Sequence, residues 1–478
     1  MRIRFLLLCT LWLLFGGGCR SNKQTAVSDS DLIPIIRTAL YDSASLFFGD
    51  FENYPRNQAA APIGIFDSGT GGLTVMEAIV TLDMFNNLTG AEGPDGICDF
   101  AGETFVYLAD QANMPYGNYA SEGKTDYLRE LVIQDALFLM KQKVKTMVIA
   151  CNTATATGLE DVCLLLDRSQ TGVSVTGVIN AGVKGALERV KKEESGTIGV
   201  MATVGTIQTG GYERTIKEMA AALGYMGNLQ VISQPAMGFA EAVDEEPDFV
   251  LRTAKEPRTN YRGPALDHAD HPIDILLLDA YNFDFVNNGV LYTRGAEGYT
   301  QLQLNAASNY ARYHLLSLME QLRNFPEPQP LKVLIMGCTH YPYYQEILQE
   351  MLQELRNYCR NGAYPYRSLI AEEVALIDPA VNTAKELYLL LRGQNLLFPG
   401  ASQSRASFYI TVPNGDLPGV GLESPRRFTY AYKYGRQPDT PLEYVKFLPF
   451  AADNIDPETL HRLRRSVPAT FFLIPDLP

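Results

Sequence analysis

Several signatures of particular functions are missing from this chain of 478 residues. It has no dense basic cluster, and its 54 Asp and Glu outnumber 40 Lys and Arg, which gives a formal net charge of -14. A broad interface with nucleic acid is therefore not expected. The five His are sparse and no C-x-x-C pattern occurs, so we expect no structural zinc or other metal site.

The apolar run near the start of the chain is too short to span a bilayer. It extends from Phe5 to Phe15, follows the basic residues Arg2 and Arg4, and leads into Gly16-Gly17-Gly18-Cys19. This pattern resembles a bacterial lipoprotein signal at residues 1–18, after which Cys19 is lipidated and anchors the protein to a membrane. The alternatives are an ordinary secretory peptide that is cleaved nearby and an uncleaved anchor.

A lipid anchor would place the protein in the bacterial cell envelope, facing the periplasm. Either the inner or the outer membrane would fit this anchor. Residues 19–59 are then expected to form a polar tether and an N-terminal extension. Cys9 leaves with the signal and Cys19 would carry the lipid, so five of the seven Cys remain, an odd number, and at least one thiol cannot pair within the chain. A free thiol is unexpected in an exported protein and is a candidate reactive group.

Short apolar runs alternate with stretches of helical periodicity, in a chain whose 46% hydrophobic and 20% charged residues are typical of a folded globular protein. Apolar residues recur at helical spacing in Leu128–Lys141 and Ala306–Leu322. The alternation predicts an α/β fold in which ligands bind beyond the carboxyl ends of parallel strands. The runs expected to form buried strands are Ile63–Phe66, Thr104–Leu108, Met147–Ala150, Val175–Ile179, Ile198–Met201, Ile275–Leu278 and Val333–Met336.

The first of these strands runs into a glycine-rich loop, Asp67–Thr74, with a helix expected to begin at about Leu73. Backbone N–H groups of such a loop can bind an anion, although a tight turn without a ligand fits the same residues. No G-K-[ST] or G-x-G-x-x-G pattern follows the strand, which disfavours phosphate as that anion.

Two cysteines occupy matching positions at the ends of predicted strands. Cys151 follows Met147–Ala150, and Cys338 follows Val333–Met336 after one glycine. A single buried cysteine is usually only a small hydrophobic residue, but two in the same context indicate two related half-domains that face one cleft.

Two thiols suit a reaction that inverts a stereocentre next to a carboxylate. One group must remove the α-proton from one face, and another must return a proton to the opposite face. A thiol can do either when its pKa is brought toward neutrality. Asp67 and His340 lie close in sequence to strand ends and could polarise a thiol or the substrate ammonium, although a structural role fits His340 as well.

Four segments resemble the motifs of glutamate racemase, in the aspartate/glutamate racemase superfamily, and occur in the family's order. They are I-G-I-F-D-S-G-T-G-G-L-T from Ile63, Y-L-A-D-Q-A-N-M-P-Y-G from Tyr107, I-A-C-N-T-A from Ile149 and G-C-T-H-Y-P from Gly337. Further similarity lies at Ala202–Tyr212 and Leu376–Asp378, with a fainter echo at Phe408–Asp416.

The resemblance implies an α/β fold of two pseudo-symmetric, doubly wound lobes with mainly parallel sheets and an active site in the cleft between them. It implies a racemase without a cofactor, in which Cys151 handles the proton on the D-glutamate face and Cys338 that on the L-glutamate face. Asp67 would assist Cys151, and His340 would assist Cys338. The positions that correspond to substrate-binding residues are Asp67, Ser68, Tyr116, Gly117, Asn152, Thr153, Thr339 and His340.

The chain departs from the family pattern in its second half. Gln234–Glu241 lacks the cysteine that usually precedes the proline, and its glutamate is shifted, so Glu241 is a displaced candidate for assisting catalysis. Asn180 stands where the family commonly has glutamate. Residues 244–298 form an insertion, for which we expect a lid or an extra strand unit.

The resemblance covers about residues 60 to 395 and divides the chain into lobes. We expect the first lobe at 60–177, the second at 178–340 with its insertion, a return to the first lobe at 341–398, and a C-terminal extension at 399–478. Within that extension, Ser402–Asp439 is rich in loop residues and is expected to wrap the first lobe.

The resulting hypothesis is an isomerase that interconverts L- and D-glutamate, a small-molecule amino-acid substrate. D-glutamate for the peptidoglycan of the cell wall is made in the cytoplasm, which conflicts with the export signal. One alternative is an exported amino-acid-binding lipoprotein with little or no turnover, and another is a hydantoin or maleate isomerase-like enzyme. Because members of the family commonly dimerise, a homodimer is compatible with the resemblance.

Overall fold

The computed structural model describes residues 28–243, 245–296, 298–399, 403–438, 443–451, 454–455 and 457–475. The predicted lipoprotein signal and Cys19 lie outside these residues. No helix in the described ranges is long and apolar enough to cross a membrane. The chain forms two compact units: the first contains the residues up to Val178 and from Thr383 onward, and the second contains Ile179–Asn382.

The first unit is built on a six-stranded sheet in the order β14-β11-β2-β1-β3-β4. All neighbouring strands are parallel except the pair of β11 and β14, which is antiparallel. The strands are β1 (Ile63–Asp67), β2 (Thr104–Ala109), β3 (Thr146–Ile149), β4 (Ser174–Gly177), β11 (Arg405–Pro413) and β14 (Val445–Pro449).

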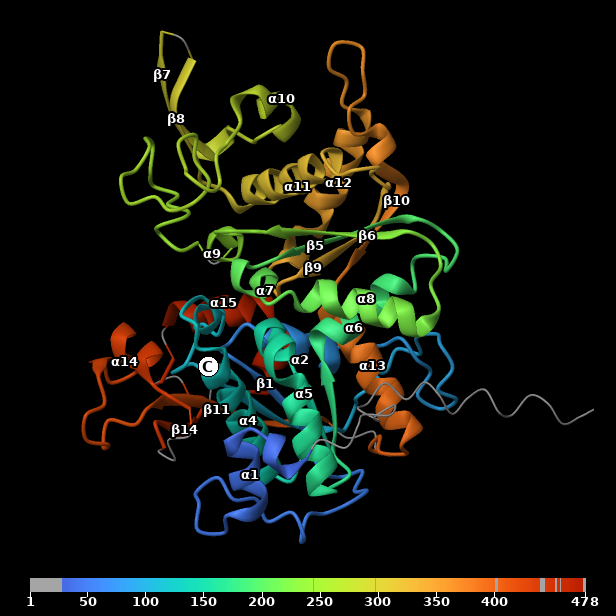
Figure 1. Ribbon diagram of the computed structural model, residues 1–478, viewed down its shortest axis with the longest axis vertical. Coiled ribbons are helices and arrows are strands. Elements are labelled where there is room, and N and C mark those ends of the chain that lie inside the picture. Colours follow the sequence, from blue (N-terminus) through green and yellow to red (C-terminus); the bar gives the residue numbers. More distant parts are fainter. Residues whose placement is uncertain are drawn as a thin grey trace, which may run out of the picture. The chain divides into compact units, whose positions relative to one another are not determined.

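Three helices cover one face of this sheet because their apolar sides share a core with Phe66, Leu108 and Ile149 of the strands. They are α1 (Pro34–Tyr41), α4 (Thr125–Lys141) and α5 (Asn152–Ser169), of which α4 and α5 pack side by side (Figure 1). The remaining elements of this unit are α2 (Leu73–Val80), α3 (Gly117–Ser121), α14 (Tyr430–Gly435), α15 (Pro457–Ser466), α16 (Pro468–Phe471), β12 (Leu422–Ser424), β13 (Arg427–Phe428) and most of α13 (Pro379–Gly393).

The second unit is built on a parallel four-stranded sheet in the order β10-β9-β5-β6. Its strands are β5 (Gly196–Ala202), β6 (Leu229–Pro235), β9 (Leu331–Gly337) and β10 (Ile370–Ile377). Helices α11 (Ala307–Arg323) and α12 (Gln345–Asn357) cover one face, and α7 (Val204–Gln208) and α8 (Gly211–Leu223) lie along the other (Figure 1). Further elements are α6 (Val178–Leu187), α9 (Phe239–Val243), α10 (Leu278–Tyr281), β7 (Val290–Gly295) and β8 (Gly298–Leu304).

The α/β fold and its mainly parallel sheets are confirmed, and six of the predicted strands form as β1 to β5 and β9. The predicted strand at Ile275–Leu278 is wrong. Ile275–Leu277 is a 3-10 helix that continues into α10, and the side chain of Leu276 is 70% exposed. The carboxylate of Asp274 accepts a hydrogen bond from the Leu276 N–H at 2.8 Å, which starts a helical turn in place of an extended strand.

The units divide the chain differently from the lobes expected from the sequence. The chain returns to the first unit at Thr383 instead of 341, because β10 pairs with β9 and completes the second sheet. The C-terminal extension does more than wrap the first unit as loops, since β11 adds to the edge of the sheet beside β2. The insertion ends in a β7–β8 hairpin.

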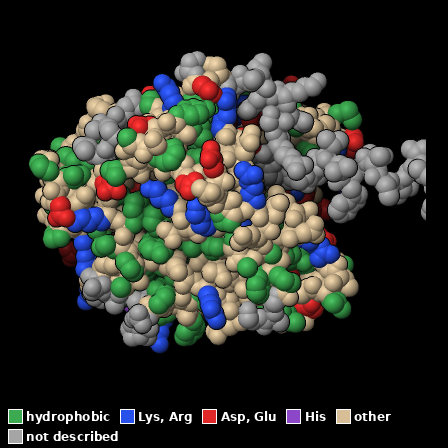
Figure 2. All heavy atoms as spheres, turned by 90° about the horizontal axis from the view of Figure 1, so that it is seen from below, with side chains coloured by type: hydrophobic (Ala, Val, Ile, Leu, Met, Phe, Trp, Pro, Cys, Tyr) green, Lys and Arg blue, Asp and Glu red, His purple; other side chains and the backbone are tan. Residues whose placement is uncertain are grey.

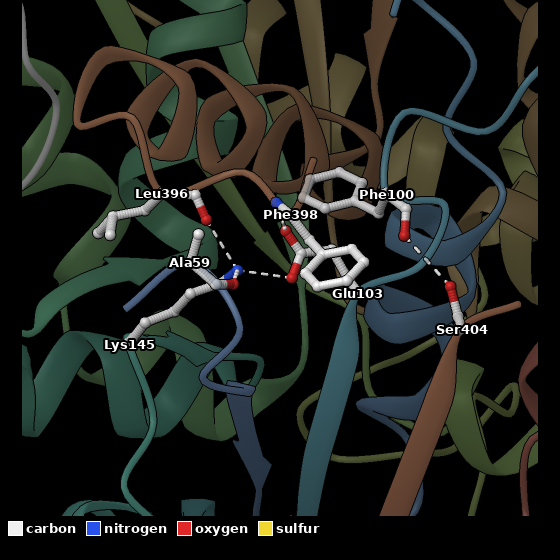
Figure 3. A network of polar contacts seen from close by, with 7 residues as sticks. All are labelled: Ala59, Phe100, Glu103, Lys145, Leu396, Phe398 and Ser404. Carbon is white, nitrogen blue, oxygen red and sulfur yellow. Dashed lines mark hydrogen bonds and ion pairs between the residues drawn. The ribbon is translucent and has the colours of Figure 1, made fainter. Parts of the chain in front are cut away.

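A buried ion pair joins the segment that leads into the C-terminal extension to the first sheet (Figure 3). The Lys145 ammonium donates hydrogen bonds to Glu103 Oε2 at 2.6 Å and to the carbonyl oxygens of Ala59 and Leu396 at 2.7 and 2.8 Å. Glu103 Oε1 accepts from the Phe398 N–H at 2.8 Å. Both charges are thus fully partnered, which a buried ion pair requires.

The surface of the described residues mixes charges of both signs. On the face drawn in Figure 2, Lys and Arg side chains lie interspersed with acidic and apolar ones.

Candidate active site

One group of candidate residues lies at the carboxyl end of β1, in the first unit. Asp67 is the last residue of this strand and is only 7% exposed. Its Oδ2 accepts hydrogen bonds from the N–H groups of Gly69 at 3.1 Å and Gly72 at 2.9 Å, so the glycine-rich loop curls around the carboxylate. Burial raises the pKa of Asp67, and these backbone donors oppose the rise.

Gly72 is required by this tight turn. A Cβ atom at position 72 would lie 2.5 Å from the Cβ of Asp67 and 2.9 Å from that of Ala150, closer than packed carbon atoms approach. The loop is also fixed from β2, because the Tyr107 hydroxyl donates to the Gly69 carbonyl oxygen at 2.8 Å. Sequence reasoning did not single out Tyr107.

Cys151 follows the neighbouring strand β3 and is the N-cap residue of α5. Its thiol is 7% exposed and lies 3.6 Å from the Ser68 hydroxyl, and its sulfur accepts a hydrogen bond from the Ala154 N–H at 3.4 Å. Burial, followed by the negative charge of Asp67, raises the pKa of Cys151 to about 12. The structure therefore brings Asp67, Ser68 and Cys151 together, as the sequence predicted, and holds the thiol protonated at neutral pH.

Asn152 and Thr153 form the first turn of α5, where backbone N–H groups lack partners within the helix.

Tyr116 and Gly117 differ from each other in the groups that they can offer a substrate. The Tyr116 hydroxyl is buried 2.6 Å from Asp110 Oδ2 and 2.7 Å from Asp135 Oδ2, so this side chain is committed to the interior. Only the backbone at Tyr116 and Gly117, where α3 begins, is left for a ligand.

A second group of candidate residues lies at the carboxyl end of β9, in the second unit. Cys338 directly follows this strand and is 8% exposed. Its Sγ is 3.5 Å from Nδ1 of His340, and the Thr339 hydroxyl is 3.4 Å from the same nitrogen. The structure thus brings Cys338, Thr339 and His340 together, with a ring nitrogen within reach of the thiol proton.

Two buried tyrosines surround Cys338 and were not singled out from the sequence. Burial raises the pKa of Tyr212 and of Tyr341, and the charge that Cys338 can carry raises both further. Gly337 allows this packing, since a Cβ atom there would lie 2.9 Å from the Tyr212 ring and from the Ala202 Cβ.

A glutamate racemase from Geobacter metallireducens is 27% identical to this chain over 354 residues, which span 74% of this chain and 88% of the relative. One from Pseudomonas entomophila is 26% identical over 374 residues, which span 77% and 97%. The chain is a glutamate racemase-like isomerase. A crystal structure of a glutamate racemase isoform from Bacillus anthracis superimposes with a TM-score of 0.44 at 23% identity, over 73% of this chain and 88% of the other. No family model matches the chain.

The altered segment before Glu241 in this isomerase is fixed by a buried histidine. His314 has no exposed surface, and its Nε2 donates to the Met237 carbonyl oxygen at 3.0 Å while its Nδ1 lies 3.2 Å from the Gln234 amide nitrogen. Burial lowers the pKa of His314 to about 3, so the ring stays neutral. Gln234 thus has a packing role at the position where the family pattern differs.

The other second-unit candidates have less direct relations to Cys338. Glu241 lies on α9. Its charge contributes to the raised pKa of Tyr341, but less than burial and less than the charge of Cys338. Asn180 lies in α6. In the described ranges, no group of three or more His, Cys, Asp or Glu is placed to hold a metal ion.

Proposed function

We propose that this isomerase interconverts L- and D-glutamate without a cofactor, using the thiols of Cys151 and Cys338 as its acid/base pair. The observation that carries the proposal is that each thiol lies just beyond the carboxyl end of a buried parallel strand, beside a group able to influence its proton. Asp67 and Ser68 accompany Cys151, and His340 accompanies Cys338. The curated relatives of this chain are glutamate racemases.

The proposed reaction begins when the Cys338 thiolate removes the α-proton of L-glutamate. The electron pair of the broken C–H bond is delocalised into the substrate carboxylate, and Cys151 then donates its thiol proton to the opposite face of the α-carbon. In this direction His340 accepts the Cys338 proton beforehand, and the product is D-glutamate. The raised pKa of Cys151 suits it to be the initial proton donor.

The substrate carboxylates and ammonium need partners of opposite polarity. We propose that the first turn of α5 at Asn152 and Thr153, together with the N–H of Gly117, receives carboxylate oxygens. Ser68 and Thr339 add hydroxyl donors, and Asp67 balances the ammonium.

The decisive experiment measures α-proton exchange by NMR in deuterated water, with reducing agent, for L- and D-glutamate separately. We expect wild-type protein to exchange both enantiomers, and Cys151→Ala and Cys338→Ala each to abolish racemisation or to leave exchange of one enantiomer. Cys359→Ala removes a thiol that is exposed and is the matched control. If glutamate and a panel of other amino acids all fail to exchange while one of them binds, the proposal is wrong and a binding protein takes its place.

The cellular setting is a separate proposal that rests on the sequence of residues 1–19 alone. We propose that Cys19 is lipidated and anchors the protein in the cell envelope. Incorporation of labelled palmitate in the producing cells should be lost in Cys19→Ser, and equal labelling of both proteins would contradict it. Light scattering of the signal-free protein would test whether it is a homodimer.

A further inference from the structure

The loop that follows β2, Asp110–Gly117, is held from outside by the C-terminal extension. The Thr411 hydroxyl of β11 donates to Asp110 Oδ1 at 2.7 Å and accepts from the Ala112 N–H at 3.0 Å. The Lys433 ammonium donates to the Met114 carbonyl oxygen at 2.6 Å. Successive positions of the loop are therefore fixed by residues about 300 positions later in the chain.

Arg436 adds further contacts from the extension and is itself buried, with 6% of its surface exposed. Its Nη2 donates to Asn113 Oδ1 at 2.6 Å and lies 3.0 Å from the Tyr119 hydroxyl, and its Nε donates to the Lys433 carbonyl oxygen at 3.1 Å. The guanidinium thus connects Asn113 in the loop, Tyr119 in α3 and the carbonyl oxygen of Lys433 in α14.

Aromatic rings compensate the buried charge of Arg436. The guanidinium carbon is 4.6 Å from the ring centroid of Phe428, 5.1 Å from that of Tyr127 and 5.3 Å from that of Tyr444. Tyr127 belongs to α4, whereas the other two belong to the extension. A cation removed from water over several ring faces is held firmly, so Arg436 has little freedom to release Asn113.

Asn113 connects Arg436 to the predicted substrate-binding residues through hydrogen bonds. Its Nδ2 donates to both oxygens of Asp110, at 3.0 and 2.9 Å, and Asp110 Oδ2 accepts from the Tyr116 hydroxyl. Gly117, the neighbour of Tyr116, begins α3. A series of hydrogen bonds therefore connects Arg436 to the Tyr116 side chain, whose own backbone adjoins the Gly117 N–H proposed to bind a substrate carboxylate.

We propose that Arg436 is a positioning residue that sets the Tyr116–Gly117 backbone for substrate through Asn113 and Asp110. This inference rests on the proposed racemase function, and it makes the C-terminal extension part of the binding site. A residue that only stabilised the fold would affect the whole first unit, whereas a positioning residue affects the loop and the binding of substrate.

The test compares full-length wild-type protein, Arg436→Met, Arg436→Lys and the control Arg427→Met, which alters an exposed arginine of the same extension. Backbone hydrogen exchange, measured by mass spectrometry without substrate, should be about tenfold or more faster over 110–122 in Arg436→Met. Exchange in β3 should stay at the wild-type rate, and Arg427→Met should match wild type throughout.

Racemisation kinetics provide the second readout. We expect Arg436→Met to raise the KM for glutamate about tenfold or more and to change kcat much less, with Arg436→Lys in between because it keeps the charge but lacks the planar fork. Three results for Arg436→Met would each overturn the inference. They are hydrogen exchange over 110–122 at the wild-type rate, uniformly faster hydrogen exchange across the first unit, and a KM equal to that of wild type. If the wild-type protein racemises no glutamate, the proposed function fails instead, and exchange over 110–122 still decides whether Arg436 holds the loop.

Discussion

The protonation state of the Cys151 thiol can be tested directly, because its environment predicts an unusual dependence on pH. The pKa rises from the ordinary value of 9.0 to about 12, with burial as the larger cause and the charge of Asp67 as the second. This rise in the pKa corresponds to about 4 kcal/mol of preference for the protonated thiol. At pH 8 about one in 10,000 folded molecules would carry the thiolate, against about one in ten after unfolding.

The assay is the rate at which iodoacetamide alkylates the peptide containing Cys151, measured by mass spectrometry between pH 7 and pH 10.5. In folded protein the rate should keep rising about tenfold per pH unit over this range, because only the thiolate reacts. In urea-unfolded protein the rise should level off near pH 9. The shape of the profile is compared, and not the absolute rate, because burial also slows access of the reagent.

Two further samples separate the causes of the shift. Asp67→Asn removes the negative charge and can still accept from Gly69 and Gly72, so the midpoint should fall while staying above that of unfolded protein. The exposed thiol of Cys359 verifies that the reagent is active at each pH. A folded-state profile that levels off at pH 9 or below would refute the reasoning, provided circular dichroism shows that the protein is folded there.

Two further predictions concern stability, measured by urea unfolding. Lys145→Met leaves the buried Glu103 without its cation and should lower the free energy of unfolding by about 3–5 kcal/mol, whereas Lys446→Met, at an exposed ion pair with Asp416, should cost less than about 1 kcal/mol. Equal losses in both variants would contradict this account. Gly72→Ala forces a Cβ against two strand ends and should cost about 1–3 kcal/mol, while Gly393→Ala, with nothing within 4 Å of the new Cβ, should cost little. A stable Gly72→Ala protein with full activity would contradict the packing argument.

The strand ends could be predicted from the sequence because parallel strands place their carboxyl ends along one edge. Asp67 and Cys151 come directly after a buried apolar run and Cys338 follows one after a single glycine, and the structure places each at or just beyond such an end. The run Ile275–Leu278 has the same composition but forms helical turns. Four apolar residues do not distinguish strand from helix, and the deciding contact, from the Asp274 side chain, is local and polar.

The environment of Tyr116 could not be predicted because it depends on residues distant in sequence. Its position in a motif indicates proximity to substrate, but its hydroxyl lies between the carboxylates of Asp110 and of Asp135 on α4. Likewise, the Arg436 site requires β11 to add to the sheet beside β2, and a segment read as loop-rich carries no periodicity that would reveal it.

The two thiols differ in the groups beside them, and the difference fits their proposed order of action. Asp67 is a negative charge, which makes removal of the proton from Cys151 harder and keeps this thiol a donor. His340 instead places a ring nitrogen 3.5 Å from the sulfur of Cys338, where it can accept that proton. A two-base racemase needs one base deprotonated and one acid protonated at the moment the substrate binds. An Asp67→His and His340→Asp double variant exchanges these neighbours. It should therefore favour a thiolate at Cys151 and a protonated thiol at Cys338 before substrate binds, and make Cys151 the more rapidly alkylated of the two.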